Sequence, residues 1–170
     1  MSTSFVSTIS SVIFNDYVTK WFNRINSDTG PSRRGGNKLR LYKCVKSDFE
    51  PEQYCKLILP PRHRSAFSKF RFGVAPIRIE TGRYEGLSID ERLCPFCDNV
   101  ENEYHVLFNC TVYSDIREHL FNHAIVCNNM FPTLSDNDKF NFLFSTSCMI
   151  RACAKTCFQI LQRRLFLSCK

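Results

Sequence analysis

Long apolar runs are missing from this chain of 170 residues. No stretch approaches the ~20 consecutive apolar residues that a helix needs to span a bilayer. The first residues, MSTSFVSTISSVIF, also lack the basic start and the long apolar block of a secretory signal. We therefore expect no membrane association and an intracellular location, nuclear or cytoplasmic. In such a reducing compartment the ten cysteines are expected as thiols or metal ligands rather than as disulfides.

Patterns of catalytic sites are missing as well. His63, His119 and His123 have no candidate nucleophile at a recognisable spacing, and the glycines of GPSRRGGNK do not match a phosphate-binding loop. No internal repeat with a period of roughly 20–50 residues is present. We therefore expect a chain without enzymatic activity, whose function is binding.

Apolar residues, in contrast, make up 44% of the chain, and sixteen of them are Phe. This excludes a disordered tail and supports one domain with a hydrophobic core, or one domain plus an arm. Apolar residues recur at helical steps of three and four in the segments 5–25, 62–73, 111–126 and 148–167. Pro60 and Pro61 precede the second of these helices and Gly73 ends it. Ser135, with Asp138 three residues later, gives a weaker N-cap signal.

Other segments are less regular. Residues 39–49 (LRLYKCVKSDF) fit either a strand or a short helix, and residues 75–84 (APIRIETGRY) alternate between apolar and polar as an extended segment does. The three glycines and the proline of SDTGPSRRGGN predict a linker. The chain is therefore expected to be mostly α, with short extended segments.

One short stretch, LCPFCDNVENEYHVLFNC, carries the clearest chemical signal. Its spacing is Cys94-x2-Cys97-x7-His105-x4-Cys110. Zinc prefers four nitrogen or sulfur ligands in a tetrahedron, and two cysteines two residues apart can point into one turn, which Pro95 would help to shape. His105 would project from a short helix. Asn109, in a left-handed conformation, would then end that helix and turn Cys110 back toward the other ligands.

The alternative is that these cysteines are small buried apolar residues and that the histidine is an ordinary core residue. Four such residues together favour the zinc site. A site closed by four protein ligands is structural, because catalytic zinc keeps a position open for water. Such sites contribute about 10–16 kcal/mol of binding free energy. We therefore expect removal of the metal to unfold at least residues 90–125.

Glu101 precedes His105 by four residues and has two interpretations. It would accept a hydrogen bond from the imidazole and fix its tautomer, or it would lie near a helix N-terminus because the helix dipole favours a carboxylate there.

Of the other cysteines, Cys153 and Cys157 lie on the apolar stripe of the last helix and are expected in the core. The rest have no partner at ligand spacing: Cys44, Cys55, Cys127, Cys148 and Cys169.

These features divide the chain into two parts. Residues 1–37 are expected to form an N-terminal amphipathic helix and a Gly/Arg-rich linker. Residues 38–170 are expected to contain a basic helical segment, a zinc-binding module at about 90–125, and C-terminal helices. The second part is interpreted as a small helical domain organised around a Cys-Cys-His-Cys zinc knuckle.

Charge is unevenly distributed along the chain. Net charge is +7 over residues 1–92, −5 over 93–148 and +5 over 149–170, and positions 31–71 hold eleven basic residues against three acidic ones. A basic block beside a ligand-rich module is typical of polyanion binding, although it also fits a merely solvated basic surface.

Phe67 and Phe70 are expected in the core. The predicted phosphate contacts are Arg33, Arg34, Lys69, Arg71, Arg78 and Arg83. Because nothing recognisable reads base edges, we expect little sequence specificity and a steep loss of affinity with salt.

The chain contains five short motifs in a defined order. They are FRFG (70–73), GRY (82–84), ERLCPFC (91–97), EYHVLFNC (103–110) and VYxxxR (112–117). Together they resemble the C-terminal zinc-binding segment of reverse transcriptases encoded by non-LTR (LINE-type) retrotransposons. The resemblance runs from about Lys38 to Arg164 and includes KLRLYK, LSDNDKF and AKTCFQILQRR, and its specific part is the Cys-Cys-His-Cys spacing.

The resemblance implies a zinc role for Cys94, Cys97, His105 and Cys110, and a contribution to binding template RNA or target DNA. No polymerase Tyr/Phe-x-Asp-Asp motif is present, so polymerase activity is not implied for this chain. The expected function is a zinc-stabilised nucleic-acid-binding module. The alternative is a zinc-folded protein-interaction or assembly module, whose outer helices dock onto a reverse-transcriptase body or a second copy of the chain.

Overall fold

The computed structural model describes residues 3–27, 39 and 41–168. This part of the chain is mostly helical, as expected, and its β-type pairing is limited to an isolated antiparallel bridge between Leu93 and Val100. The helices are α1 (Thr3–Asn26), α2 (Tyr42–Val45), α3 (Pro61–Arg71), α4 (Arg78–Tyr84), α5 (Ser114–Cys127), α6 (Asp136–Ser145) and α7 (Ser147–Ser168). The shorter helical turns are η1 (Gln53–Cys55), η2 (His105–Asn109), η3 (Thr111–Tyr113) and η4 (Phe131–Thr133).

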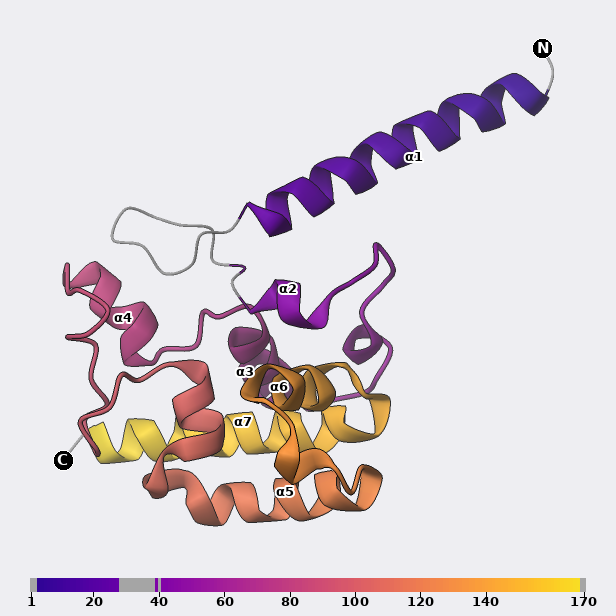
Figure 1. Ribbon diagram of the computed structural model, residues 1–170. Coiled ribbons are helices and arrows are strands. Elements are labelled where there is room, and N and C mark those ends of the chain that lie inside the picture. The colour runs from indigo at the N-terminus through magenta and orange to yellow at the C-terminus, as the bar shows by residue number, and fades with distance from the viewer. Residues whose placement is uncertain (1–2, 28–38, 40, 169–170) are drawn as a thin grey trace.

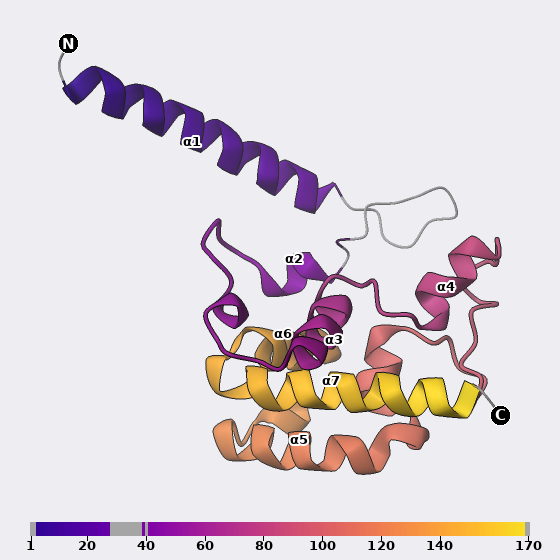
Figure 2. The ribbon, with the colours of Figure 1, turned by 180° about the vertical axis from the view of Figure 1, so that it is seen from behind.

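The last helix, α7, is the centre of the body. It packs against α3, α5 and α6, and both views show α5 running beside it (Figures 1 and 2). Its inward face is fully buried and consists of Met149, Ile150, Cys153, Ala154, Cys157 and Ile160. The expectation that Cys153 and Cys157 are core residues is therefore confirmed.

Helix α3 is formed as the sequence predicts. It begins at Pro61, where the missing N–H costs nothing because the first helical N–H groups have no intrahelical partner. Just after its end, Gly73 adopts a φ of 67°, a left-handed conformation that glycine takes without penalty. Phe67 and Phe70 are fully buried, as expected, and Phe67 stacks on Phe144 of α6 with the ring centroids 4.8 Å apart.

Helix α1 is present where the periodicity predicts it, but most of it projects away from the body (Figure 1). Near its end, Ile25 is buried and the Trp21 ring lies edge-on to Tyr42 and Phe49. The apolar side chains of its first two-thirds are exposed, namely Val6, Ile9, Val12, Ile13, Phe14 and Tyr17. Apart from Phe14, whose ring lies edge-on to Phe49, the apolar side chains of this part of the helix are therefore largely uncovered by the body of the chain.

The extended segment expected at residues 75–84 is wrong over most of its length, because Arg78–Tyr84 form α4. The helix start is fixed by a distant residue: the Glu101 carboxylate accepts the N–H of Arg78 at 2.6 Å, and the Glu101 carbonyl accepts the N–H of Ile79 at 2.9 Å. The ambiguous segment at 39–49 contains the short helix α2. The N-cap predicted at Ser135 is confirmed, since its hydroxyl accepts the N–H of Asp138.

Candidate metal centre

The first two cysteines lie in a tight hairpin. The Cys94 N–H donates to the Asn99 carbonyl at 2.7 Å, and the Glu101 N–H donates to the Arg92 carbonyl at 2.9 Å. These bonds flank the Leu93–Val100 bridge and close a turn that carries Cys94 and Cys97 on one side. Within the turn, Asp98 has a φ of 52°, the left-handed conformation that short polar residues tolerate.

The other two candidate ligands flank the π-helical turn η2. Asn102 accepts the N–H of His105 at the start of this turn. At its end the N–H of Cys110 donates to the carbonyl of His105 at 2.7 Å, the i to i+5 pattern of a π-helix. The wider turn brings Cys110 back beside His105. The expected left-handed Asn109 is therefore wrong, because among the described non-glycine residues the left-handed conformation occurs at Asp98.

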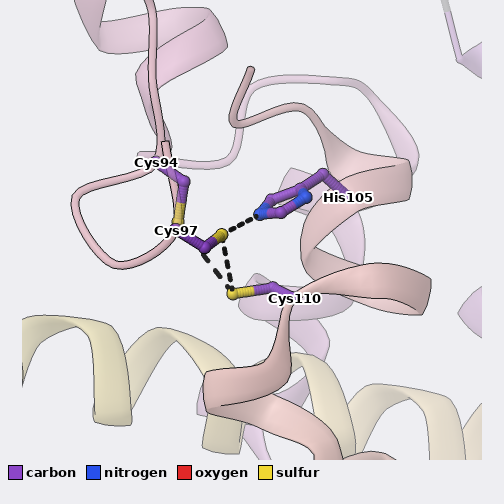
Figure 3. A group of neighbouring side chains, drawn as sticks. All are labelled: Cys94, Cys97, His105 and Cys110. Atoms are coloured by element: carbon purple, nitrogen blue, oxygen red, sulfur yellow. Dashed lines mark hydrogen bonds between the residues drawn. The ribbon is translucent and has the colours of Figure 1, made fainter. Parts of the chain in front are cut away.

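The four side chains converge on one point (Figure 3). Their donor atoms, three Sγ and one imidazole nitrogen, all lie within 4.8 Å of one another. The Cys94–Cys110 and Cys97–Cys110 sulfur pairs are each 3.9 Å apart, and Cys97 Sγ lies 3.1 Å from His105 Nε2. Sulfur ligands about 2.3 Å from a tetrahedral ion are separated by ~3.8 Å, so this spacing fits a four-coordinate metal ion.

The cluster is enclosed by protein. Cys94 and Cys110 are 1% exposed, His105 is 8% exposed and Cys97 is half-buried. Burial raises the pKa of the Cys94 thiol to about 12, raises the pKa of Cys110 and lowers the pKa of His105. A buried thiolate is costly without a positive charge nearby, and a neutral imidazole is the form that binds metals. The set can therefore hold a metal ion, which would supply the missing charge.

Glu101 connects the cluster to the rest of the fold. It is fully buried, and its two oxygens accept from Arg164 Nε at 3.1 Å and Arg164 Nη2 at 2.8 Å. It lies before the helix that carries His105, and it caps α4 rather than that helix. Neither interpretation of Glu101 from the sequence included Arg164, because a partner 63 positions away leaves no local signal.

The predicted phosphate contacts are only partly at the surface. Arg71 is buried and donates to the carbonyls of Phe144 and Val45 and to Glu52, so its assignment as a phosphate contact is corrected. Arg83 is ion-paired with Glu80, and its side chain is 11% exposed. Arg78 is ion-paired with Glu85. Lys69 is exposed on α3. Arg33 and Arg34 lie outside the described residues.

A groove between α3 and α7 was not predicted. It has a volume of about 430 Å³. Arg62 and Lys69 line it from α3, and Phe158, Leu161 and Leu165 line it from α7. The sequence indicated only part of this groove. Arg62 and Lys69 are recognisable as members of a basic segment, but periodicity does not show which apolar residues of a distant helix lie beside them.

Comparison with family models, with curated proteins and with solved structures found no match to this chain. None of the helices in the described ranges has the length and apolar character to cross a membrane.

Proposed function

We propose that this chain is a zinc-stabilised nucleic-acid-binding module that resembles the C-terminal tail of a non-LTR reverse transcriptase and contacts RNA or DNA phosphates without strong sequence readout. The observation that carries the proposal is the convergence of Cys94, Cys97, His105 and Cys110. Thiolate and imidazole donors in a tetrahedral arrangement suit zinc better than magnesium or calcium, which prefer oxygen ligands. Four protein ligands leave no open position, so the ion is structural.

The role of the ion follows from what the cluster joins. One side is the hairpin that contains Cys94 and Cys97, and the other is η2, which leads through Cys110 and η3 into α5. Without an ion, the hairpin is closed by few backbone hydrogen bonds. The free energy of zinc binding, about 10–16 kcal/mol in such sites, is comparable to the whole stability of a small domain. Zinc would therefore hold the hairpin against η2 and the segment that leads into α5.

The nucleic-acid part of the proposal is supported by the α3–α7 groove. Arg62 and Lys69 line the groove and are exposed on α3. Phosphates are bound by such cations, while apolar and aromatic side chains such as Phe158 offer a surface for unpaired bases. The proposed contact face is therefore this groove. It includes Lys69 from the predicted set but not Arg71, Arg78 or Arg83.

The test is metal analysis of the purified full chain, together with salt-titrated binding to short single-stranded RNA and DNA. We expect one zinc per chain and an affinity that falls linearly with salt on a logarithmic scale. A chain that contains zinc but binds neither nucleic acid would refute the nucleic-acid role and leave the metal site standing. A metal-free, fully folded chain would refute the metal site.

A zinc-folded protein-interaction or assembly module is the second candidate, and the exposed apolar residues of α1 favour it. Six large apolar side chains that are largely exposed on one helix suggest burial against a reverse-transcriptase body or another copy. Sedimentation of the full chain over a range of concentrations would test self-association. Dimers that form without any nucleic-acid binding would support this second function over the first.

A further inference from the structure

Two exposed cysteines with no role in the metal cluster lie side by side. Cys127 is the last residue of α5 and Cys148 is the second residue of α7. They are 21 positions apart in the chain, yet their sulfur atoms are 3.5 Å apart. Among the described residues no His, Asp or Glu joins them as a third metal ligand. The spacing in the sequence showed no partner for either cysteine.

The pair occupies one end of an antiparallel helix pair. At the other end, Arg163 of α7 pairs with Asp115 in the first turn of α5. The metal cluster lies at that same other end, because Cys110 immediately precedes η3 and α5, and Arg164 pairs with Glu101. Helices α5 and α7 run beside each other between the two sites (Figure 2). The thiol pair is thus separate from the cluster and lies at the opposite end of the same helices.

The position of the pair suits reversible oxidation. Both thiols are exposed to solvent, whereas Cys94, Cys110, Cys153 and Cys157 are buried. A disulfide needs sulfur atoms about 2.05 Å apart, so the observed gap must close by only ~1.5 Å. Rotation about the side-chain bonds at two helix ends can supply such a shift. A small oxidant can therefore reach both sulfur atoms without opening the core.

We propose that Cys127 and Cys148 form a redox-sensitive pair that is oxidised by thiol–disulfide exchange with a low-molecular-weight disulfide of the glutathione class. The thiolate of one cysteine attacks the small disulfide, whose S–S bond breaks and releases one glutathione thiolate. The second cysteine thiolate then attacks the protein sulfur of this mixed disulfide and releases the second glutathione. Two protein thiols are oxidised, one small disulfide is reduced to two thiols, and the two cysteine protons pass to the released thiolates. The product closes a loop that contains η4 and α6.

The test uses the full chain equilibrated in buffers of rising oxidised-to-reduced glutathione ratio. After acid quenching and alkylation, trypsin releases Cys127 in the peptide 118–139 and Cys148 in the peptide 140–151. We expect these two peptides to become cross-linked at a low oxidised-to-reduced glutathione ratio. This ratio should be at least about tenfold below the one at which Cys55 forms a mixed disulfide with glutathione, because the second thiol of the pair acts at high effective concentration. Cys55 is a matched control, since it is also an exposed thiol but has no neighbouring cysteine sulfur in the described structure.

The variants Cys127→Ser and Cys148→Ser complete the test. In each, the remaining thiol should take up one glutathione at the same ratio as Cys55, and the cross-linked peptide should be absent. Circular dichroism checks that both variants fold. The proposal is overturned if both wild-type thiols form separate mixed disulfides in parallel with Cys55, or remain thiols when Cys55 is modified. Because the readout is the peptide linkage, the result does not depend on whether zinc or nucleic acid is bound.

Discussion

Glu101 and Arg164 form a buried ion pair that joins the candidate metal centre to the end of the central helix. Arg164 Nη2 lies 2.8 Å from Glu101 Oε2, and the Glu101 side chain is 0% exposed. The same carboxylate accepts the N–H of Arg78, the first residue of α4. One side chain therefore links α4, the cysteine hairpin and α7.

The substitution Glu101→Gln should lower the free energy of unfolding by about 2–4 kcal/mol, because Arg164 is left partly buried without its counter-charge. Urea unfolding of the metal-loaded protein measures this loss. Glu118→Gln, at an exposed position of α5, should change stability by less than about 0.5 kcal/mol. Zinc affinity should remain nearly unchanged in both variants. A tenfold weaker affinity in Glu101→Gln would instead show that the carboxylate orients His105.

Chelation of the metal should unfold at least residues 90–125, since the four ligands join the hairpin to η2 and their metal would supply much of the stability of this segment. Far-UV circular dichroism should show loss of helix, and hydrogen exchange should show that the loss includes this segment. Cys97→Ser should behave in the same way without chelator, whereas Cys55→Ser, which removes an exposed thiol away from the cluster, should not. A metal-free protein with an unchanged spectrum would contradict the prediction.

Zinc affinity should rise steeply with pH. An ordinary cysteine thiol has a pKa of ~8.5 and is protonated near neutral pH, and burial in the folded cluster raises the pKa of Cys94 and Cys110 further, so these thiols must lose their protons when zinc binds. Unfolding of residues 90–125 in the metal-free state leaves His105 near the ordinary histidine pKa of ~6.5, so above ~pH 7 its imidazole is mostly neutral and releases few protons. The three thiol ligands release about three protons, so the affinity should rise about three decades per pH unit between ~pH 7 and ~8. Chelator competition at several pH values measures the slope.

At zinc concentrations high enough to load the three remaining ligands, the Cys97→Ser variant provides the control for this slope, which should fall to about two decades per pH unit. A wild-type slope near two would show that one cysteine is not a ligand. A slope near four would show that His105 is protonated before the metal binds.

Gly82→Ala should destabilise the protein, although alanine is the better helix former. A Cβ at position 82 would lie 2.7 Å from Cγ of Arg92. Arg92 is buried and donates to the carbonyls of Ile79 and Leu87, so it cannot move freely. We expect a loss of about 1–3 kcal/mol, against a gain of about 0.5–1 kcal/mol from helix propensity alone. Thermal or urea unfolding gives the sign, and a gain in stability would contradict the packing argument.

In the α3–α7 groove, the double substitution Arg62→Gln with Lys69→Gln should weaken binding to RNA and DNA. Each lost phosphate contact should reduce the slope of log affinity against log salt by about one. The matched control is Lys43→Gln with Lys56→Gln, which removes the same charge from exposed positions that do not line the groove. Equal effects of the two pairs would show that only net charge matters and that the groove is not the contact face.

Local patterns predicted the long elements. Periodic apolar residues indicated α1, α3, α5 and α7 because each helix buries or presents one stripe. Proline and glycine marked the ends of α3 because their backbone preferences act within a single residue. The pattern failed at α4. Ile77, just before the helix, and Ile79, its second residue, are both buried, and Glu101 accepts the first N–H groups of the helix. A cap supplied by a residue more than twenty positions away cannot be read from a local window.

The sequence alone determined the four candidate metal ligands, because their chemistry and close spacing leave few other arrangements. Tertiary structure decided the rest. It buried Arg71 among backbone carbonyls, placed Arg62 and Lys69 beside Phe158, and brought Cys127 next to Cys148. The physical reason is that packing of α3 and α5 against α7 depends on contacts between residues far apart in the chain, and neither charge nor periodicity encodes which of those residues meet.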